Sequence, residues 1–352
     1  MLTRVFILCV ALLAMPVGCG RSPASRPAPG GPGTFKVAVG IPGSTADAGW
    51  YYSAKGGAVR IGRELKLVEP VSVIENVAAS QRKAALRDYA RNGYALVICH
   101  GYEFNQPVKE IAADFPATTF IVSGYDQPSD DFGSIVYQLG EAAYLCGAVA
   151  AQVSQTGCVG FIAAQQVPPV ELCYHGFRSG FLKYRSDGRV REPVYINGVN
   201  PWEDSAAAKV KTQALLGTSD PCTIDVLFQN ADAASRGVFE AVEQHAGGAP
   251  VFVFGANRDQ NGTTATSKVL ASAVIRVDEA FLRVARQVRA GTYKPRVESQ
   301  TVATGVIDCV LNPSLDAMVG PQTAQKCRGV VEQAREELRS GEEQPYDGGP
   351  GR

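Results

Sequence analysis

Short apolar runs alternate with amphipathic stretches along the first half of this chain. Runs of buried-strand character occupy 35–41, 71–74, 95–99, 118–122 and 134–137. Apolar residues at helical spacing lie between or after them, at 54–65, 80–93, 107–113 and 140–153. Parallel strands require crossover connections, so this order predicts a parallel sheet with helices on both faces.

The same alternation starts again at residue 158. Strands are predicted at 158–162, 193–197, 224–228, 250–254, 269–275 and 302–310, with helices at 170–185, 203–216, 233–245, 278–290 and 322–339. We therefore expect an α/β protein with two doubly wound parallel-sheet lobes joined by a hinge. The first lobe is assigned to 35–138 plus about 271–300, and the second to 139–270 plus about 301–340. Residues 341–352 are expected to form a disordered tail.

The N-terminal segment has the pattern of an export signal. Arg4 is followed by an apolar run at 5–13 that is too short to span a bilayer, so 1–18 is predicted to be a signal peptide. The sequence Pro16-Val-Gly-Cys19 is similar to a bacterial lipobox, which predicts that Cys19 carries lipid, palmitate included. Residues 19–34 then form a flexible tether. Ordinary signal-peptidase cleavage is the alternative.

Composition narrows the class of partner. Among 352 residues the formal net charge is zero and 19% are charged, with no basic cluster, which argues against nucleic acid as a partner. Seven cysteines follow Cys19, so at least one is free or bonded to another molecule, and no CxxC or Cys/His spacing predicts a metal site. Cys99 and Cys146 are expected to be packed thiols; the pairing of the others stays open.

The loop between the first strand and the first helix, 40–52, carries the strongest binding signal. Asp47 offers a carboxylate and Trp50 a flat aromatic face, at the strand edge where open α/β sheets bind ligands. Such a pair suits a ligand with hydroxyls and a ring. Further polar and aromatic candidates follow the strands of both halves: Tyr51, Tyr102, Trp202, Asn230, Asp232, Asn257 and Asp259.

Each candidate also has a purely structural interpretation. Asp47 is a favoured type of helix N-cap, and Trp50 is of a type that is usually well buried. Asn257 and Asp259 are good turn formers. The three histidines share no spacing, so surface or satisfied-core positions are expected for them.

Four motifs together carry a family resemblance. Asp47-Ala-Gly-Trp-Tyr-Tyr52, Gly140-Glu-Ala-Ala-Tyr-Leu-Cys-Gly147, Trp202-Glu-Asp204 and Gly255-Ala-Asn-Arg-Asp-Gln260 resemble, in the same order, the bacterial basic membrane protein family. These are PnrA-like, purine nucleoside-binding lipoproteins of ABC transporters. The likeness covers about residues 35–330 and implies a type I periplasmic-binding-protein fold.

The resemblance also implies roles for individual residues. Asp47 and Trp50 fall on the aspartate and the aromatic that contact the purine, and Trp202 is the nearest candidate for a second aromatic. The aspartate that holds the ribose falls at Asn257 or Asp259. The chain departs from the family in having Asn257 for the usual aspartate, Ile275 for a lysine, and Ala54 for a histidine of this branch.

The sequence therefore predicts a monomeric, lipid-anchored solute-binding protein on the extracytoplasmic side of the cell or outer membrane. Its predicted partners are a purine nucleoside and an ABC permease, without cofactor or enzymatic activity. One alternative is a ligand-sensing receptor for another ring-bearing polar solute such as a sugar. The other is an enzyme acting on nucleosides, although no GxSxG, HExxH or GxxxxGK[ST] motif is present.

Overall fold

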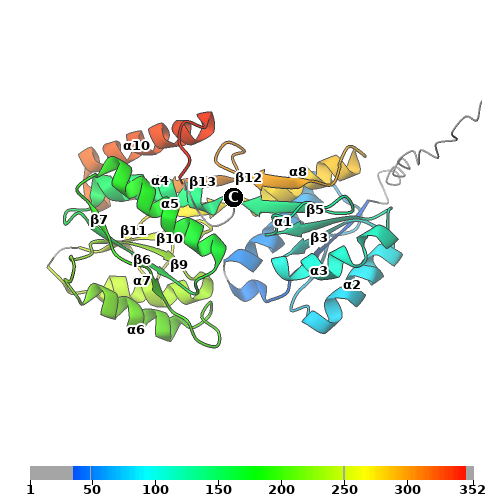
Figure 1. The fold of residues 1–352 in the computed structure, drawn as a ribbon, viewed down its shortest axis with the longest axis horizontal. Helices are drawn as coiled ribbons and strands as arrows, with labels where there is room; N and C mark the ends of the chain where they lie inside the picture. The colour runs from blue at the N-terminus through cyan, green and yellow to red at the C-terminus, as the bar shows by residue number, and fades with distance from the viewer. Residues whose placement is uncertain (1–34, 48, 249, 346–352) are drawn as a thin grey trace, which may run out of the picture.

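The computed structural model describes residues 35–345 except 48 and 249, and it contains two lobes that lie side by side (Figure 1). The predicted signal peptide, Cys19 and the tether lie outside the described residues. Each lobe is built on one sheet, of six strands in the first and seven in the second. The predicted two-lobed α/β architecture is confirmed.

The first sheet has the order β12-β5-β4-β3-β1-β2, and every pair in it is parallel. The bounds are β1 (Lys36–Gly40), β2 (Ser72–Ile74), β3 (Tyr94–His100), β4 (Thr119–Ser123), β5 (Gly133–Tyr137) and β12 (Val297–Gln300). The helical segments of this lobe are η1 (Thr45–Asp47), α1 (Trp50–Glu64), α2 (Ala79–Arg91), η2 (Tyr102–Phe104), α3 (Asn105–Lys109), η3 (Ala112–Asp114) and α8 (Val277–Arg289).

The second sheet has the order β13-β11-β10-β9-β6-β7, with β8 also paired to β6. The bounds are β6 (Cys158–Ala163), β7 (Arg189–Val190), β8 (Val194–Tyr195), β9 (Val226–Asn230), β10 (Phe252–Asn257), β11 (Val269–Ile275) and β13 (Ile307–Leu311). Only β13 runs antiparallel to its neighbour within the described residues. The helical segments are α4 (Leu139–Val153), α5 (Pro168–Tyr184), α6 (Ser205–Leu216), η4 (Asp232–Ala234), α7 (Ser235–Gln244), α9 (Leu315–Val319) and α10 (Pro321–Ser340).

Two boundaries of the sequence assignment need correction. Residues 271–275, assigned to the first lobe, belong to β11, which pairs with β10 and β13 in the second sheet. The expected tail also begins too early, because residues 341–345 are described and Glu343 forms an ion pair with Lys183, at 2.5 Å. The remainder of the tail, 346–352, lies outside the described residues.

The described chain passes between the lobes at three places, namely Gln138, Arg276 and residues 301–306, and these passages are bonded to one another. The Gln138 amide donates to the Gln300 carbonyl at 2.9 Å, and the Val302 amide donates to the Glu141 carboxylate at 2.6 Å. Arg276 donates to the Gly305 carbonyl at 2.9 Å and pairs with Asp308 at 3.0 Å. These bonds connect the segments around the three passages, so the passages form one hydrogen-bonded region between the lobes.

The core of the second lobe includes a very close contact of α4 with α5. A Cβ added to Gly147 would lie 2.2 Å from the Phe177 carbonyl oxygen, and one added to Gly176 would lie 2.1 Å from the Gly140 carbonyl oxygen. Only glycine permits this approach, so the backbones of the two helices are in direct contact.

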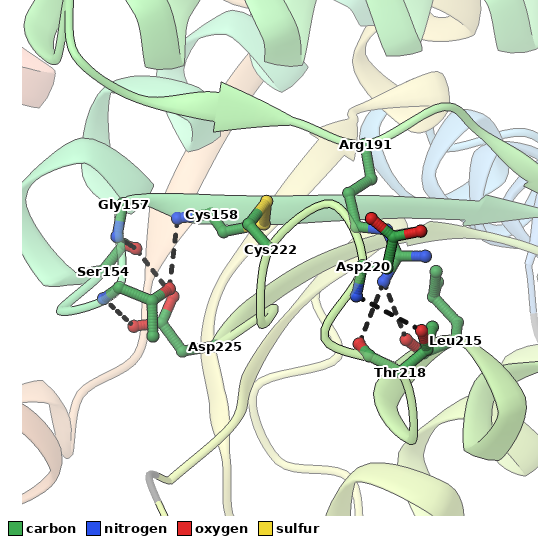
Figure 2. The surroundings of a disulfide bond; sticks show 10 residues. Ser154, Gly157, Cys158, Arg191, Leu215, Thr218, Asp220, Cys222 and Asp225 are labelled. Carbon is green, nitrogen blue, oxygen red and sulfur yellow. Dashed lines mark hydrogen bonds between the residues drawn. A yellow bond between two sulfur atoms is a disulfide. The ribbon is translucent and has the colours of Figure 1, made fainter.

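A disulfide joins Cys158, at the start of β6, to Cys222 in the loop before β9 (Figure 2). The neighbouring Asp225 carboxylate accepts bonds from the Ser154 hydroxyl at 2.6 Å and from the Gln155 and Thr156 amides at 2.6 and 2.9 Å. The disulfide and the Asp225 hydrogen bonds lie at the amino end of β6, opposite the edge expected to bind ligand. The other cysteines of the described chain are free and buried, as predicted for Cys99 and Cys146.

Candidate functional site at the facing edges of the lobes

The loops after the strands of one lobe contact those of the other. Gly49, just before α1, lies so close to η4 that a Cβ added to it would stand 2.4 Å from Oδ1 of Asp232. Nearby, the Arg258 guanidinium of the second lobe lies over the Tyr52 ring of the first, 5.7 Å from its centroid. The carboxyl edges of the two sheets therefore face each other here, as the sequence predicted.

Trp50 is the first residue of α1 and lies half-buried over the ends of β3 and β4. Its indole stacks on the His100 imidazole, with centroids 3.9 Å apart and planes inclined by 30°. The Tyr137 ring contacts it edge-on at 5.4 Å. A Cβ on Gly124 would lie 3.2 Å from the indole, so this glycine leaves room for the ring. Trp50 thus forms an aromatic wall at the edge of the first lobe.

A polar pair stands opposite, at the edge of the second lobe. The Asn257 side-chain amide donates to the Asp232 carboxylate at 2.6 Å. Both residues have left-handed backbones, with φ of 67° and 46°. Non-glycine residues adopt this conformation rarely, and such strain tends to persist at functional sites. The pair brings a carboxylate to the position that faces Gly49.

Buried amide side chains fix the loops that carry this pair. The Gln260 side-chain oxygen accepts bonds from the Gln229 side chain and from the Ala256 backbone N–H, both at 2.9 Å, and the Gln260 backbone N–H donates to the Ser272 hydroxyl at 2.9 Å. Gln229 accepts from the Ala231 amide at 3.0 Å. Since these groups are buried and paired, the ends of β9 and β10 are held rigidly.

The remaining candidates of the first lobe lie along the same edge. Asp47 ends η1, and the N-cap of α1 is Gly49, so the alternative of Asp47 as the cap of this helix is wrong. Tyr51 lies over Gly43 and approaches Glu103, with its hydroxyl 3.4 Å from the carboxylate. Tyr102 follows β3 and is 64% exposed, which makes it a rim residue.

In the second lobe, Trp202 and Asn230 lie close to η4 along the chain or in contact with it, and Asp259 lies in the turn after β10. The Trp202 carbonyl accepts from the Ala234 amide at 2.9 Å, which places Trp202 against η4. Asn230 ends β9, buried, with its amide 3.5 Å from the Cys173 sulfur. Asp259 is exposed, and its carboxylate accepts from the Asn261 amide at 2.9 Å, as expected of a turn former.

His100 is the residue whose contribution to the site the sequence analysis missed. It was assigned with the other histidines to surface or satisfied-core positions, and it is indeed fully buried. Burial lowers the pKa of His100 to about 3, so its ring is neutral at ordinary pH. Its place directly after an apolar strand, at the ligand-binding edge, was the available signal.

The motifs and the two-lobed geometry agree with a comparison against protein families. The sequence model of the Bmp family, described as ABC transporter substrate-binding protein PnrA-like, matches residues 34–336. The chain belongs to this family. The family resemblance predicted from the motifs is therefore confirmed.

Individual relatives are distant. A purine-binding protein of Brucella abortus is 25% identical over 56% of this chain and 54% of its own length. The ABC transporter nucleoside-binding protein BmpA of Lactococcus lactis is 26% identical, over 61% of each chain. The transcriptional activator protein med of Bacillus subtilis is 24% identical over 88% of this chain and 90% of its own length. The chain thus spans little more than half of the first relative's length.

Solved structures confirm the type I periplasmic-binding-protein fold. An ABC transporter solute-binding protein from Aeropyrum pernix superposes with a TM-score of 0.72 at 19% identity, covering 88% of this chain and 92% of its own. A transcriptional activator of the comK gene from Bacillus halodurans gives 0.72 at 21% identity, covering 88% and 100%. In the part of the chain that the structure describes, no helix is long and apolar enough to cross a membrane.

Proposed function

We propose that this protein is the extracytoplasmic receptor of an ABC importer and captures a purine nucleoside between its lobes. The observation that carries the proposal is the opposition of an aromatic wall, Trp50, and a carboxylate, Asp232, on lobes that meet at Gly49. A base can stack on the indole while the carboxylate accepts bonds from ribose hydroxyls. Asp47, Tyr51, Tyr102 and Trp202 complete the proposed site, together with Asn230, Asn257 and Asp259.

The expected energies are adequate for capture. Stacking of one base on an aromatic ring contributes about 1–3 kcal/mol, and each hydrogen bond to a charged group about 1.5–3 kcal/mol. Two such bonds and one or two stacked rings approach the roughly 8 kcal/mol of micromolar binding, provided that lobe closure excludes water. The names of the Brucella and Lactococcus relatives support a purine or nucleoside as the ligand class.

The test is calorimetric titration of the purified protein with adenosine and guanosine, with ribose and glucose as the alternative class. We expect Trp50→Ala, Asp47→Ala and Asp232→Asn each to weaken nucleoside binding at least tenfold, since each removes about 1.4 kcal/mol or more. Asp187→Asn is the matched control, because Asp187 is 83% exposed in the turn before β7. Unchanged affinity in all three site variants would refute the assignment.

Two alternatives remain as outcomes of the same titration. Binding of sugars but not of nucleosides would make the protein a receptor for another ring-bearing solute. Chromatography of the same mixtures detects cleavage of the nucleoside. Release of free base would show that the protein is an enzyme and would overturn the receptor proposal.

A ligand-sensing role beside a membrane signalling protein is a second candidate, because a Bacillus relative that this chain matches over 90% of its length is named as a transcriptional activator and not as a transport protein. Receptor and sensor share the ligand site and differ in the partner. Nucleoside uptake in cells lacking this chain separates them: loss of uptake supports the importer, and unchanged uptake supports the sensor.

We also propose attachment by lipid at Cys19, with 19–34 as the tether and the permease as membrane partner. The disulfide Cys158–Cys222 supports an oxidising, extracytoplasmic location. Labelled palmitate should be incorporated into the parent protein and not into Cys19→Ser, which should be released from the membrane. Labelling of the variant would contradict the anchor.

A further inference from the structure

Trp50 is linked to a chain of hydrogen-bonded polar groups, buried at His100 and Ser123 and half-buried at Tyr137, that nothing in the ligand site itself requires. Nε2 of His100 lies 3.0 Å from the Trp50 carbonyl oxygen, and Nδ1 lies 2.9 Å from the Ser123 hydroxyl. The Ser123 hydroxyl in turn lies 3.0 Å from the Tyr137 hydroxyl. The chain therefore runs from β5 through β4 and β3 to the first residue of α1.

Donor and acceptor roles along this chain are fixed by elementary hydrogen-bond chemistry. A carbonyl oxygen only accepts, so Nε2 of His100 carries the proton. The ring is neutral, so Nδ1 accepts, and the single hydroxyl proton of Ser123 must point to it. Tyr137 must then donate to Ser123, and burial raises the pKa of Tyr137, which keeps its proton in place. Every member of the chain is satisfied in only one orientation.

The same residues hold the indole by ring contacts. His100 covers one face of Trp50, and Tyr137 contacts it edge-on. Phe281 of α8 and Tyr51 in turn pack edge-on against the imidazole, at 5.6 and 6.4 Å. His100 therefore covers one face of the half-buried indole and Tyr137 contacts its edge, so these ring contacts restrict the orientation of the indole.

We propose that His100 is a positioning residue which, through Ser123 and Tyr137, sets the plane of Trp50 before a ligand arrives. A receptor whose stacking surface is already ordered loses less side-chain freedom on binding than one whose surface must be ordered by the ligand. The neutral imidazole acts by stacking and by one hydrogen bond, and it need not contact the ligand. The role in affinity rests on the proposed function, whereas the ordering of Trp50 does not.

The experiment removes, one at a time, the two hydroxyl groups that are hydrogen-bonded in series to His100. Tyr137→Phe deletes one hydroxyl and keeps the ring that touches Trp50, and Ser123→Ala breaks the link to His100. The control is Tyr89→Phe, because the Tyr89 and Ser72 hydroxyls form a like bond of 3.0 Å in the same lobe, between α2 and the edge strand β2, which β1 separates from β3.

The first readout is optical and needs no ligand. The chain has two tryptophans, so Trp202→Phe leaves Trp50 as the sole indole reporter. We expect Tyr137→Phe and Ser123→Ala to lose near-UV circular dichroism of Trp50 and to lower its fluorescence anisotropy, while Tyr89→Phe keeps both. Unchanged Trp50 signals in both chain variants would overturn the proposal.

The second readout is affinity, measured with Trp202 intact. We expect adenosine to bind about 3–10-fold more weakly to Tyr137→Phe and Ser123→Ala, as when one side chain must be immobilised on binding. Equal affinity beside altered optical signals would refute the role in binding. If the parent protein binds no nucleoside, the proposed function fails while the optical result still decides whether the chain orders Trp50. Should Ser123→Ala not fold, His100→Gln, which keeps a donor but no ring, takes its place.

Discussion

Replacing Gly49 by alanine tests whether the contact of the two lobes controls binding. The added methyl would stand 2.4 Å from Oδ1, 3.0 Å from Cγ and 3.2 Å from Cβ of Asp232. Asp232 cannot turn aside freely, because Asn257 holds its carboxylate at 2.6 Å. The methyl must therefore break this bond or move the lobes apart.

The expected loss of binding free energy follows from the hydrogen bond between Asn257 and Asp232 that the methyl would break. A hydrogen bond to a carboxylate contributes about 1.5–3 kcal/mol, and each 1.4 kcal/mol changes a dissociation constant tenfold. We expect Gly49→Ala to weaken adenosine binding by about 10–150-fold. The stability of the separate lobes should hardly change, since the contact exists only between them.

The assay is calorimetry for affinity and thermal denaturation without ligand for stability. Gly56→Ala, within α1 itself, is the control because nothing lies within 4 Å of its added Cβ. That variant should bind normally and gain about 0.5–1 kcal/mol of helix stability. Parental affinity in Gly49→Ala would refute the reasoning, as would an equal loss in Gly56→Ala.

Two further predictions concern stability. Burial raises the pKa of Glu141 to about 7, so this residue favours the folded state at low pH, and that contribution is lost as pH rises from 4.5 through 7. Glu141→Gln should therefore raise the free energy of unfolding at pH 8 by about 1–3 kcal/mol and leave it unchanged at pH 4, measured by urea denaturation; an equal gain at both pH values would contradict this. Cys158→Ser opens a disulfide whose cysteines are 64 residues apart and should cost about 2–4 kcal/mol without affecting ligand affinity. Thermal denaturation with and without reductant checks it, because reductant should lower the midpoint of the parent and not of the variant.

The alternation of strands and helices could be predicted because strands buried on both faces are continuous apolar runs. The strands in the last quarter of the chain are less predictable from the sequence. β12, with sequence Val-Glu-Ser-Gln, is a half-exposed edge strand without an apolar run, so local pattern does not reveal it. The lobe to which β11 belongs depends on its pairing with β10, which is a tertiary property.

The site was predictable in part for a similar reason. Trp50 and Asp232 lie in loops or helix starts after strands and Asn257 is the last residue of β10, so the fold alone predicts that they lie at the ligand-binding edge. The link from His100 to Tyr137 joins side chains from three strands, and no spacing along the chain encodes it. The partner of Cys222 was equally hidden, since connectivity cannot be read from the order of cysteines.

The glycine contact of α4 with α5 has a consequence for how the lobes can separate. A Cβ on Gly180 would lie 2.1 Å from the Tyr144 carbonyl oxygen, so the two backbones interlock and neither helix can slide along the other. Because α4 starts directly after Gln138, no rotation can be absorbed within that helix. Opening at this passage must then be a torsion of the few backbone bonds around Gln138, since α4 stays with the second lobe.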